Sequence, residues 1–218
     1  MTCEVSIQEP RLLGQPAIRI EDKVLRKILH AIVPTAGGIY SPSEDSFLML
    51  DTICNIPVEK QEVLDVGTGS GILGLFCALR GANVTATDVA ETTLVHVQKA
   101  ARTLGVSLNT VLSDLFSNVS GRFDLVMFNP PYIPSAALED RTVDGGKRGV
   151  GLMRRFLATL PTHLKAGGSA LLLLSSLNDP SSLIAEHPDF DFSVAARHAL
   201  FFEELQVLHL RFRDDIAC

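Results

Sequence analysis

The sequence contains no tryptophan, only two tyrosines and only four cysteines in 218 residues. The cysteines are Cys3, Cys54, Cys77 and Cys218. They form no CxxC pair, and the six histidines share no ligand spacing with them. Structural zinc sites and disulfide frameworks need Cys and His in close, regular spacing. We therefore expect no metal and no disulfide framework, and a reducing cytoplasm is the natural setting.

The chain also lacks an excess of positive charge and any long hydrophobic run. Its formal net charge is -6. Proteins that hold nucleic acid by neutralising phosphates need clustered Lys and Arg, so we expect no stable nucleic-acid binding. The densest apolar runs, 72–79 and 170–174, are much shorter than the roughly 20 residues that span a bilayer. No charged and apolar leader opens the chain, and we expect no membrane association.

Short apolar segments alternate with segments of helical periodicity through the middle of the chain. The pattern predicts strands over 62–66, 84–88, 108–112, 123–129 and 169–175, and helices over 72–80, 92–104 and 150–164. Two further strand-like runs, 192–198 and 205–212, are typical of an antiparallel hairpin at a sheet edge. We predict an α/β fold with a doubly wound, mostly parallel, seven-stranded sheet that ends in this hairpin.

The first 38 residues are less regular than the rest. A helix is predicted over 21–33, because its apolar side chains form one stripe: Val24, Leu25, Ile28, Leu29 and Ile32. We expect an N-terminal extension over 1–38, with this helix packed on a main domain over 39–218.

A glycine-rich turn follows the first predicted strand. Gly69, Gly71 and Gly74 match the pattern GxGxxG, which brings a nucleotide-like ligand close to the backbone. Asp88 ends the next strand, where an acid can hold ribose hydroxyls. The glycine pattern alone fits a dinucleotide, another nucleoside ligand, or a tight turn with no ligand.

Asp65, at the end of the first strand, favours a methyl donor over a dinucleotide. A pyrophosphate at this turn would meet the Asp65 carboxylate, which is electrostatically unfavourable. S-adenosylmethionine has no phosphate, and its ammonium can use acceptors near the turn. Asp114 follows the third strand and can reach the adenine edge, although a helix cap or a turn acid is an equally good interpretation of the local sequence.

The segment Asn129-Pro130-Pro131-Tyr132 directly follows the fourth predicted strand. Proline removes a backbone donor and restricts the residue before it, so this corner is rigid and rich in acceptors. The Asn129 side chain and the carbonyls can accept hydrogen bonds from a planar NH2 group, while Tyr132 offers a face for stacking. A plain proline-rich turn is the alternative. In a doubly wound sheet, this corner and the glycine turn flank one crevice.

Four basic residues follow this corner: Lys147, Arg148, Arg154 and Arg155. They could meet an acidic partner or an RNA-associated surface. The interpretation that we favour is a solvated helix face, since such faces are common.

Taken together, these segments resemble the class I S-adenosylmethionine-dependent methyltransferases, and within them the HemK-type protein glutamine methyltransferases. The stretch 40–51 resembles the segment before the first strand in the small HemK-like branch that modifies class 1 translation release factors, and 145–149 also matches that branch. The likeness spans about 39–213 and implies a Rossmann-like methyltransferase domain over 39–218. Larger HemK relatives have a helical substrate-recruiting domain, for which about 38 residues are too few.

The resemblance also implies roles for individual residues. It implies an S-adenosylmethionine site that includes the glycine turn, lined by Ser46, Asp65, Gly67, Gly69, Asp88, Asp114, Leu115 and Asn129. It implies that Asn129 also touches the substrate, with Pro130 and Tyr132 beside it as the catalytic corner. Eukaryotic and archaeal members of the branch use a small zinc-binding activator subunit at a sheet edge, for which the strand around 106–112 is the candidate here.

Three functions are compatible with these features. The leading one is methylation of a protein glutamine on its side-chain amide nitrogen, in the Gly-Gly-Gln loop of a release factor. The second is N6-adenine methylation of nucleic acid, which the acidic balance and the lack of a base-flipping domain disfavour. The third is a non-catalytic cofactor-binding subunit, which the intact Asn129–Tyr132 corner disfavours.

Overall fold

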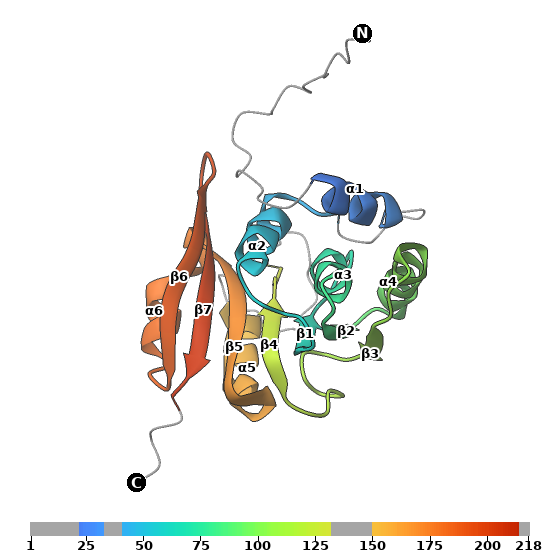
Figure 1. Ribbon diagram of the computed structural model, residues 1–218. Helices are drawn as coiled ribbons and strands as arrows, with labels where there is room; N and C mark the ends of the chain where they lie inside the picture. The colour runs from blue at the N-terminus through green and yellow to red at the C-terminus, as the bar shows by residue number, and fades with distance from the viewer. Residues whose placement is uncertain (1–21, 33–40, 132–149, 214–218) are drawn as a thin grey trace.

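Seven strands among the described residues form one mixed sheet in the order β3-β2-β1-β4-β5-β7-β6 (Figure 1). The computed structural model describes residues 22–32, 41–131 and 150–213. The strands are β1 (Glu62–Val66), β2 (Asn83–Asp88), β3 (Asn109–Leu112), β4 (Phe123–Phe128), β5 (Leu164–Ser175), β6 (Phe190–Ala199) and β7 (Glu204–Phe212). Strands β1 to β5 are parallel, and β7 pairs antiparallel with both β5 and β6. The predicted fold is confirmed, including the antiparallel hairpin at the edge.

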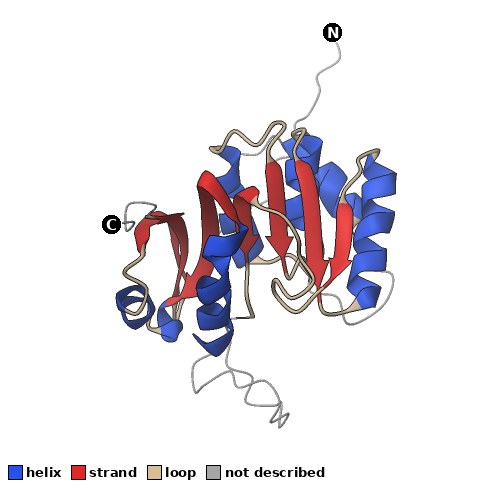
Figure 2. Cartoon of the chain, turned by 90° about the horizontal axis from the view of Figure 1, so that it is seen from below, coloured by secondary structure: helices blue, strands red, loops and turns tan. Residues whose placement is uncertain are grey.

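Helices cover both faces of the sheet (Figure 2). They are α1 (Asp22–Ala31), α2 (Glu44–Cys54), α3 (Ile72–Leu79), α4 (Glu91–Leu104), α5 (Val150–Thr159) and α6 (Pro180–Ala185). One hydrophobic core lies under α1 to α4 and the other under α5 and α6. Strands buried on both faces are apolar throughout rather than alternating, which explains the continuous run of β4. Of the helices that the structure describes, none has the length and apolar character needed to cross a membrane.

Helix α1 packs on the sheet domain as its apolar stripe predicts. Leu25, Ile28 and Ile32 are buried in the core that also holds α2 and α3. Val24 and Leu29 are partly buried against the same core. The segments 1–21 and 33–40 on either side of this helix lie outside the described residues.

Three details differ from the sequence-based expectations. The helix predicted over 150–164 ends at Thr159, and a 3₁₀ turn (Leu160–His163) follows, because Pro161 has no N–H to continue the helical ladder. Strand β5 begins at Leu164 rather than at 169, so it includes Gly167 and Gly168, a pair that is typical of a turn. Helices α2 and α6 were not predicted as helices. Most of α2 is buried, so it lacks an apolar stripe, and α6 has only six residues.

The strand order places two loops side by side. Strand β1 lies between β2 and β4, and the direction of chain progression reverses there. Val66 pairs with Phe128, so β1 and β4 end at the same level and deliver Gly67 and Asn129 to one edge. Ligands of doubly wound sheets bind at such a switch point, outside the carboxyl ends of the strands.

Candidate active site

A pocket of about 430 Å³ opens at this switch point. Its size is that of a small-molecule site. The pocket brings together nine of the predicted residues: Ser46, Asp65, Gly67, Gly69, Asp88, Asp114, Leu115, Asn129 and Pro130. Tyr132, the tenth, lies outside the described residues. Of the described residues that line the pocket, none is Lys or Arg, whereas four are aspartates: Asp45, Asp65, Asp88 and Asp114.

The glycine turn needs glycine for two different reasons. Gly67 and Gly69 have φ of 61° and 53°, in the left-handed region that other residues rarely adopt. Gly74 lies in α3, and a Cβ atom there would approach Asp65 Oδ2 to 3.0 Å. The third glycine therefore lets α3 pack directly on the Asp65 carboxylate.

Asp65 is a buried carboxylate at the bottom of the turn, with only 1% of its surface exposed. Its Oδ2 atom accepts hydrogen bonds from Thr68 Oγ1 at 2.6 Å and from the Gly74 N–H at 3.0 Å. Burial, together with a smaller effect of the Asp88 charge, raises the pKa of Asp65 to about 6 against the lowering effect of these two bonds. At neutral pH the pocket therefore holds a buried anionic acceptor that a cation would stabilise.

Asp88 connects the end of β2 to the glycine turn. Its Oδ2 atom accepts a hydrogen bond of 3.2 Å from the Gly69 N–H, and its Oδ1 atom accepts one of 2.9 Å from the Ala90 N–H. The Thr68 N–H also donates to the Thr87 carbonyl at 2.7 Å. Asp88 thus both shapes the turn and presents its carboxylate to the pocket.

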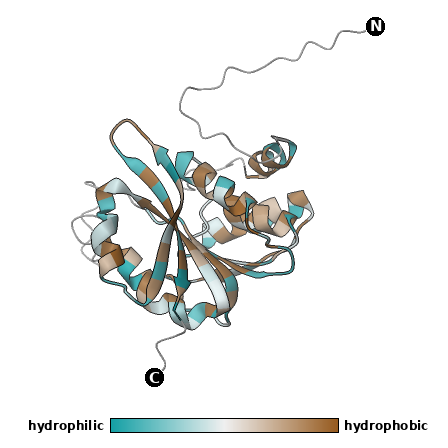
Figure 3. Cartoon of the chain, turned by 60° about the vertical axis from the view of Figure 1, so that its left-hand side comes forward, coloured by the Kyte–Doolittle hydropathy of each residue, from teal (hydrophilic) through white to brown (hydrophobic). Residues whose placement is uncertain are grey.

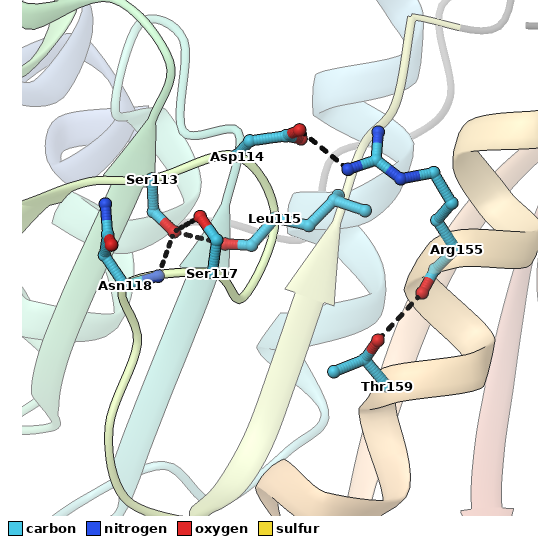
Figure 4. A network of polar contacts seen from close by, with 7 residues as sticks. All are labelled: Ser113, Asp114, Leu115, Ser117, Asn118, Arg155 and Thr159. Atoms are coloured by element: carbon cyan, nitrogen blue, oxygen red, sulfur yellow. Dashed lines mark hydrogen bonds and ion pairs between the residues drawn. The ribbon is translucent and has the colours of Figure 1, made fainter. Parts of the chain in front are cut away.

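The loop after β3 is held by a polar network (Figure 4). Ser113 Oγ donates to the Leu115 carbonyl at 2.9 Å and accepts from the Asn118 N–H at 3.0 Å. Leu115 has φ of 50° and remains buried at the pocket wall. The Asp114 carboxylate forms an ion pair of 2.7 Å with Arg155 Nη2 of α5. The network fixes this side of the pocket before any ligand enters.

The corner after β4 is oriented by a residue that the sequence interpretation missed. Asn129 Nδ2 donates a hydrogen bond of 3.0 Å to Asp45 Oδ2, and Asp45 Oδ1 accepts from the Ser46 N–H at 2.6 Å. Asn129 Oδ1 is buried and has no hydrogen-bond partner among the described residues. The acidic first turn of α2 is visible in the sequence, but nothing in its local pattern indicates that Asp45 meets Asn129.

The two described members of the basic cluster already have carboxylate partners. Arg154 Nε lies 2.6 Å from Glu186 Oε2, and Arg155 pairs with Asp114. Lys147 and Arg148 lie outside the described residues. The arginines of α5 are therefore exposed surface pairs rather than free cations.

Within 22–32, 41–131 and 150–213, no three His, Cys, Asp or Glu side chains are placed so that they could hold a metal ion. Cys77 is buried and Cys54 is half-buried, both as free thiols. Cys3 and Cys218 lie outside these ranges.

The fold and the pocket define a class I methyltransferase, with the glycine turn after β1, an acid after β2 and Asn-Pro-Pro after β4 around one cavity. Residues 30–188 match the sequence model of the methyltransferase small domain family. The chain belongs to this family and is a methyltransferase.

Named relatives agree with the HemK-type resemblance. The chain is 35% identical over 182 residues to a Methanocaldococcus jannaschii protein named as a protein N5-glutamine methyltransferase. The match covers 78% of this chain and 90% of that protein. It is 36% identical over 136 residues, 57% of its length, to a release factor glutamine methyltransferase of Deinococcus radiodurans, and it spans about half (49%) of that relative.

A solved structure has the same fold. The structure of the E. cuniculi Mtq2–Trm112 complex, described as responsible for methylation of the eRF1 translation termination factor, superposes with a TM-score of 0.65 at 24% identity. The match covers 80% of this chain and 98% of that one.

Proposed function

We propose that this chain transfers a methyl group from S-adenosylmethionine to the side-chain amide nitrogen of a glutamine in the Gly-Gly-Gln loop of a translation release factor. The observation that carries the proposal is the buried Asn129 Oδ1 atom beside the Pro130 backbone at the pocket, which has no hydrogen-bond partner within the part of the chain that the structure describes. A buried acceptor without a partner is costly unless a ligand supplies the donor. The names of the two relatives support glutamine as that donor.

The pocket fits S-adenosylmethionine better than a dinucleotide. Four aspartates without a described lysine or arginine would repel a pyrophosphate but favour a ligand with an ammonium and a sulfonium. We assign the ammonium to Asp65, the ribose hydroxyls to Asp88, and the adenine to Asp114 and Leu115. Ser46, Gly67, Gly69 and Asn129 complete this site. When bound, this cofactor supplies a methyl group on a positively charged sulfur.

The residues of the corner prepare the acceptor nitrogen. An amide nitrogen is a poor nucleophile because its lone pair is delocalised into the carbonyl. Asn129 Oδ1 and the Pro130 carbonyl would accept the two amide hydrogens, which orients the nitrogen and stabilises the positive charge that develops on it. Tyr132 would pack on the flat side chain. The methylated amide loses its extra proton readily, so no residue is assigned as a catalytic acid or base.

Asp45 would determine which end of the Asn129 carboxamide faces the substrate. A carboxylate can only accept hydrogen bonds, so the NH2 end of Asn129 must face it. The oxygen end of the same carboxamide then faces away from Asp45, as the acceptor that a glutamine amide needs. Asp45 therefore acts through Asn129 as a positioning residue.

Incubation with radiolabelled cofactor tests the proposal. Three acceptors are compared: a release factor, its Gln-to-Ala variant in the Gly-Gly-Gln loop, and double-stranded or single-stranded DNA. The expected result is label in the intact factor alone. Label in DNA would establish the adenine alternative, and cofactor binding without transfer to any acceptor would establish a non-catalytic subunit.

We also propose that a small zinc-binding activator subunit pairs with the β3 edge. Among the described strands β3 pairs with β2 alone, and its other edge would offer backbone donors and acceptors to a partner. Exposed apolar side chains occur nearby in the fold, Leu112 on β3 and Val95 on α4. The partner in the E. cuniculi complex supports such a subunit. A chain that is fully active alone would rule out dependence on it.

The remaining assignments rest on the same proposal. Residues 39–218 would form the catalytic domain and 1–38 an extension. A cytoplasmic location follows if the substrate is a translation release factor.

A further inference from the structure

Two adjacent phenylalanines form the tip of the β6–β7 hairpin. Phe201 is 91% exposed and Phe202 is 86% exposed. Their rings contact each other edge to face, with centroids 4.5 Å apart. The hairpin tip projects from the body of the protein (Figure 1) and is hydrophobic (Figure 3). Single exposed apolar residues are ordinary, but two large rings together on a projecting turn indicate a contact surface.

The turn that carries these rings is held in place. The Leu200 N–H donates to the Glu203 carbonyl at 2.7 Å and closes the turn. The Glu204 N–H donates to Ser176 Oγ at 3.0 Å, and Ser175 Oγ donates to the Glu203 carboxylate. Ser175 is the last residue of β5, and Ser176 directly follows it. The backbone that carries the rings is therefore held in place, which reduces the entropy lost when a partner binds.

The tip lies at the same edge of the sheet as the active site. Leu205, just after the tip, pairs with Ser175 at the carboxyl end of β5. Strand β5 is parallel to β4, whose carboxyl end delivers Asn129. Helix α2, which brings Asp45 and Ser46 to the pocket, packs against β6 and β7. The hairpin therefore lies beyond β5, on the side of the corner after β4 that is away from β1.

The charges around the tip favour a protein partner over nucleic acid. Glu203 and Glu204 lie directly beside the rings, and the nearby Arg197 is paired with Glu204 at 3.4 Å. A phosphate backbone would be repelled by this surface. Aromatic side chains surrounded by polar groups are typical anchors of protein interfaces.

We propose that Phe201 and Phe202 dock on an apolar surface of the protein substrate next to its methyl-accepting loop. This inference rests on the proposed function and adds where the substrate is held outside the pocket. Recognition would then have two parts, the glutamine in the pocket and an apolar contact at the hairpin tip.

Steady-state kinetics with two acceptors test this docking. The acceptors are the intact release factor and a short Gly-Gly-Gln peptide that cannot reach the tip, with the activator subunit present if activity requires it. For Phe201→Ser/Phe202→Ser we expect the KM for the factor to rise about tenfold or more, with kcat unchanged and peptide methylation unaffected. Phe201→Leu/Phe202→Leu should keep most of the affinity. Val194→Ser, which removes an exposed apolar side chain elsewhere on β6, is the matched control.

An unchanged KM for the factor would overturn the docking while leaving the proposed function intact. An equal loss with the peptide would overturn it too, since the tip would then act on the pocket. Sedimentation that shows a wild-type dimer and a monomeric Ser variant would assign the tip to a second copy instead. If thermal melting shows that the double variant does not fold, Phe201→Ser and Phe202→Ser alone carry the test. If the wild-type chain methylates neither acceptor, the proposed function fails first.

Discussion

Asp45 and Asn129 are far apart in the sequence, yet Asn129 Nδ2 donates a hydrogen bond of 3.0 Å to Asp45 Oδ2. Asp45 is 2% exposed, and α2 carries it to the corner at the end of β4. The bond explains why the Asn129 carboxamide has one orientation, with its oxygen, which meets no hydrogen-bond donor among the residues described, left as an acceptor. The catalytic corner is therefore built from two distant segments rather than from Asn129–Pro131 alone.

Asp45→Asn should lower kcat by about tenfold and change the Kd for S-adenosylmethionine much less than that. An asparagine at this position can present either end of its amide, so it no longer forces Asn129 into one orientation. Steady-state kinetics and calorimetry measure the two quantities separately. Asp51→Asn, on the same helix but outside the pocket, is the control. A parallel loss of cofactor affinity in Asp45→Asn would indicate a cofactor-binding role instead.

Asn129→Ala should retain most cofactor binding and lose turnover by about 100-fold or more, because one well-placed polar group is removed from the transition state. Single-turnover assays with saturating cofactor measure this loss directly. The double variant with Asp45→Asn should be no slower than Asn129→Ala alone, since Asp45 acts through Asn129. Methylation at the wild-type rate would remove Asn129 from the mechanism.

Cofactor affinity should depend on pH through Asp65. Its carboxyl group is buried, its pKa is raised to about 6, and it holds its proton in the free protein at moderately acidic pH. An ammonium beside it favours the ionised form, so binding should release a proton, and affinity should increase from about pH 5 to about pH 7. Calorimetry in buffers of different ionisation enthalpy measures the release. Asp65→Asn should bind more weakly at neutral pH and show a flatter profile, whereas a wild-type profile in that variant would exclude Asp65 as the titrating group.

The same pKa predicts a change in the free energy of unfolding of the cofactor-free protein. In the unfolded chain an aspartate titrates near 3.9, so between about pH 4 and about pH 6 the unfolded state binds fewer protons than the folded state. The contribution of Asp65 therefore makes the protein less stable as pH rises through this window. Urea unfolding gives the free energy of unfolding of the wild type and of Asp65→Asn at several pH values across the window. The difference between the two slopes of this free energy against pH is the contribution of Asp65.

Asp88→Asn should weaken cofactor binding by about tenfold, because it removes the charge that attracts the ribose hydroxyls. Asp88→Ala should weaken it further, since the Gly69 and Ala90 N–H groups also lose their acceptor. Titration calorimetry measures both. Glu91→Gln, an exposed acid nearby at the start of α4, is the control, and wild-type affinity in Asp88→Ala would contradict the assignment.

Hydrophobic patterning was sufficient to predict most of the fold. The strand predicted over 62–66 matches β1, and the hairpin strands match β6 and β7 closely, because these runs have the length and periodicity of strands. Helix α2 was not predicted because it is buried on most sides and so lacks an apolar stripe. The early start of β5 was missed because pairing with β4 keeps its glycine pair extended, an effect of tertiary structure that local propensity does not contain.

The site was predictable where its residues follow strands in recognisable order, and not where distant segments meet. The glycine turn and the Asn-Pro-Pro corner follow β1 and β4, and parallel strands bring such loops to one edge. Contacts such as Asp45 with Asn129 and Arg155 with Asp114 depend on how helices pack over that edge. No spacing in the sequence encodes those distances.

Tandem mass spectrometry of the methylated release factor shows directly which residue receives the methyl group. We expect the added mass of one methyl substitution on the side-chain amide of the glutamine in the Gly-Gly-Gln loop, with the wild-type chain and not with Asn129→Ala. A methyl group on any other residue, or an unmodified glutamine after the factor has incorporated label, would contradict the proposed function.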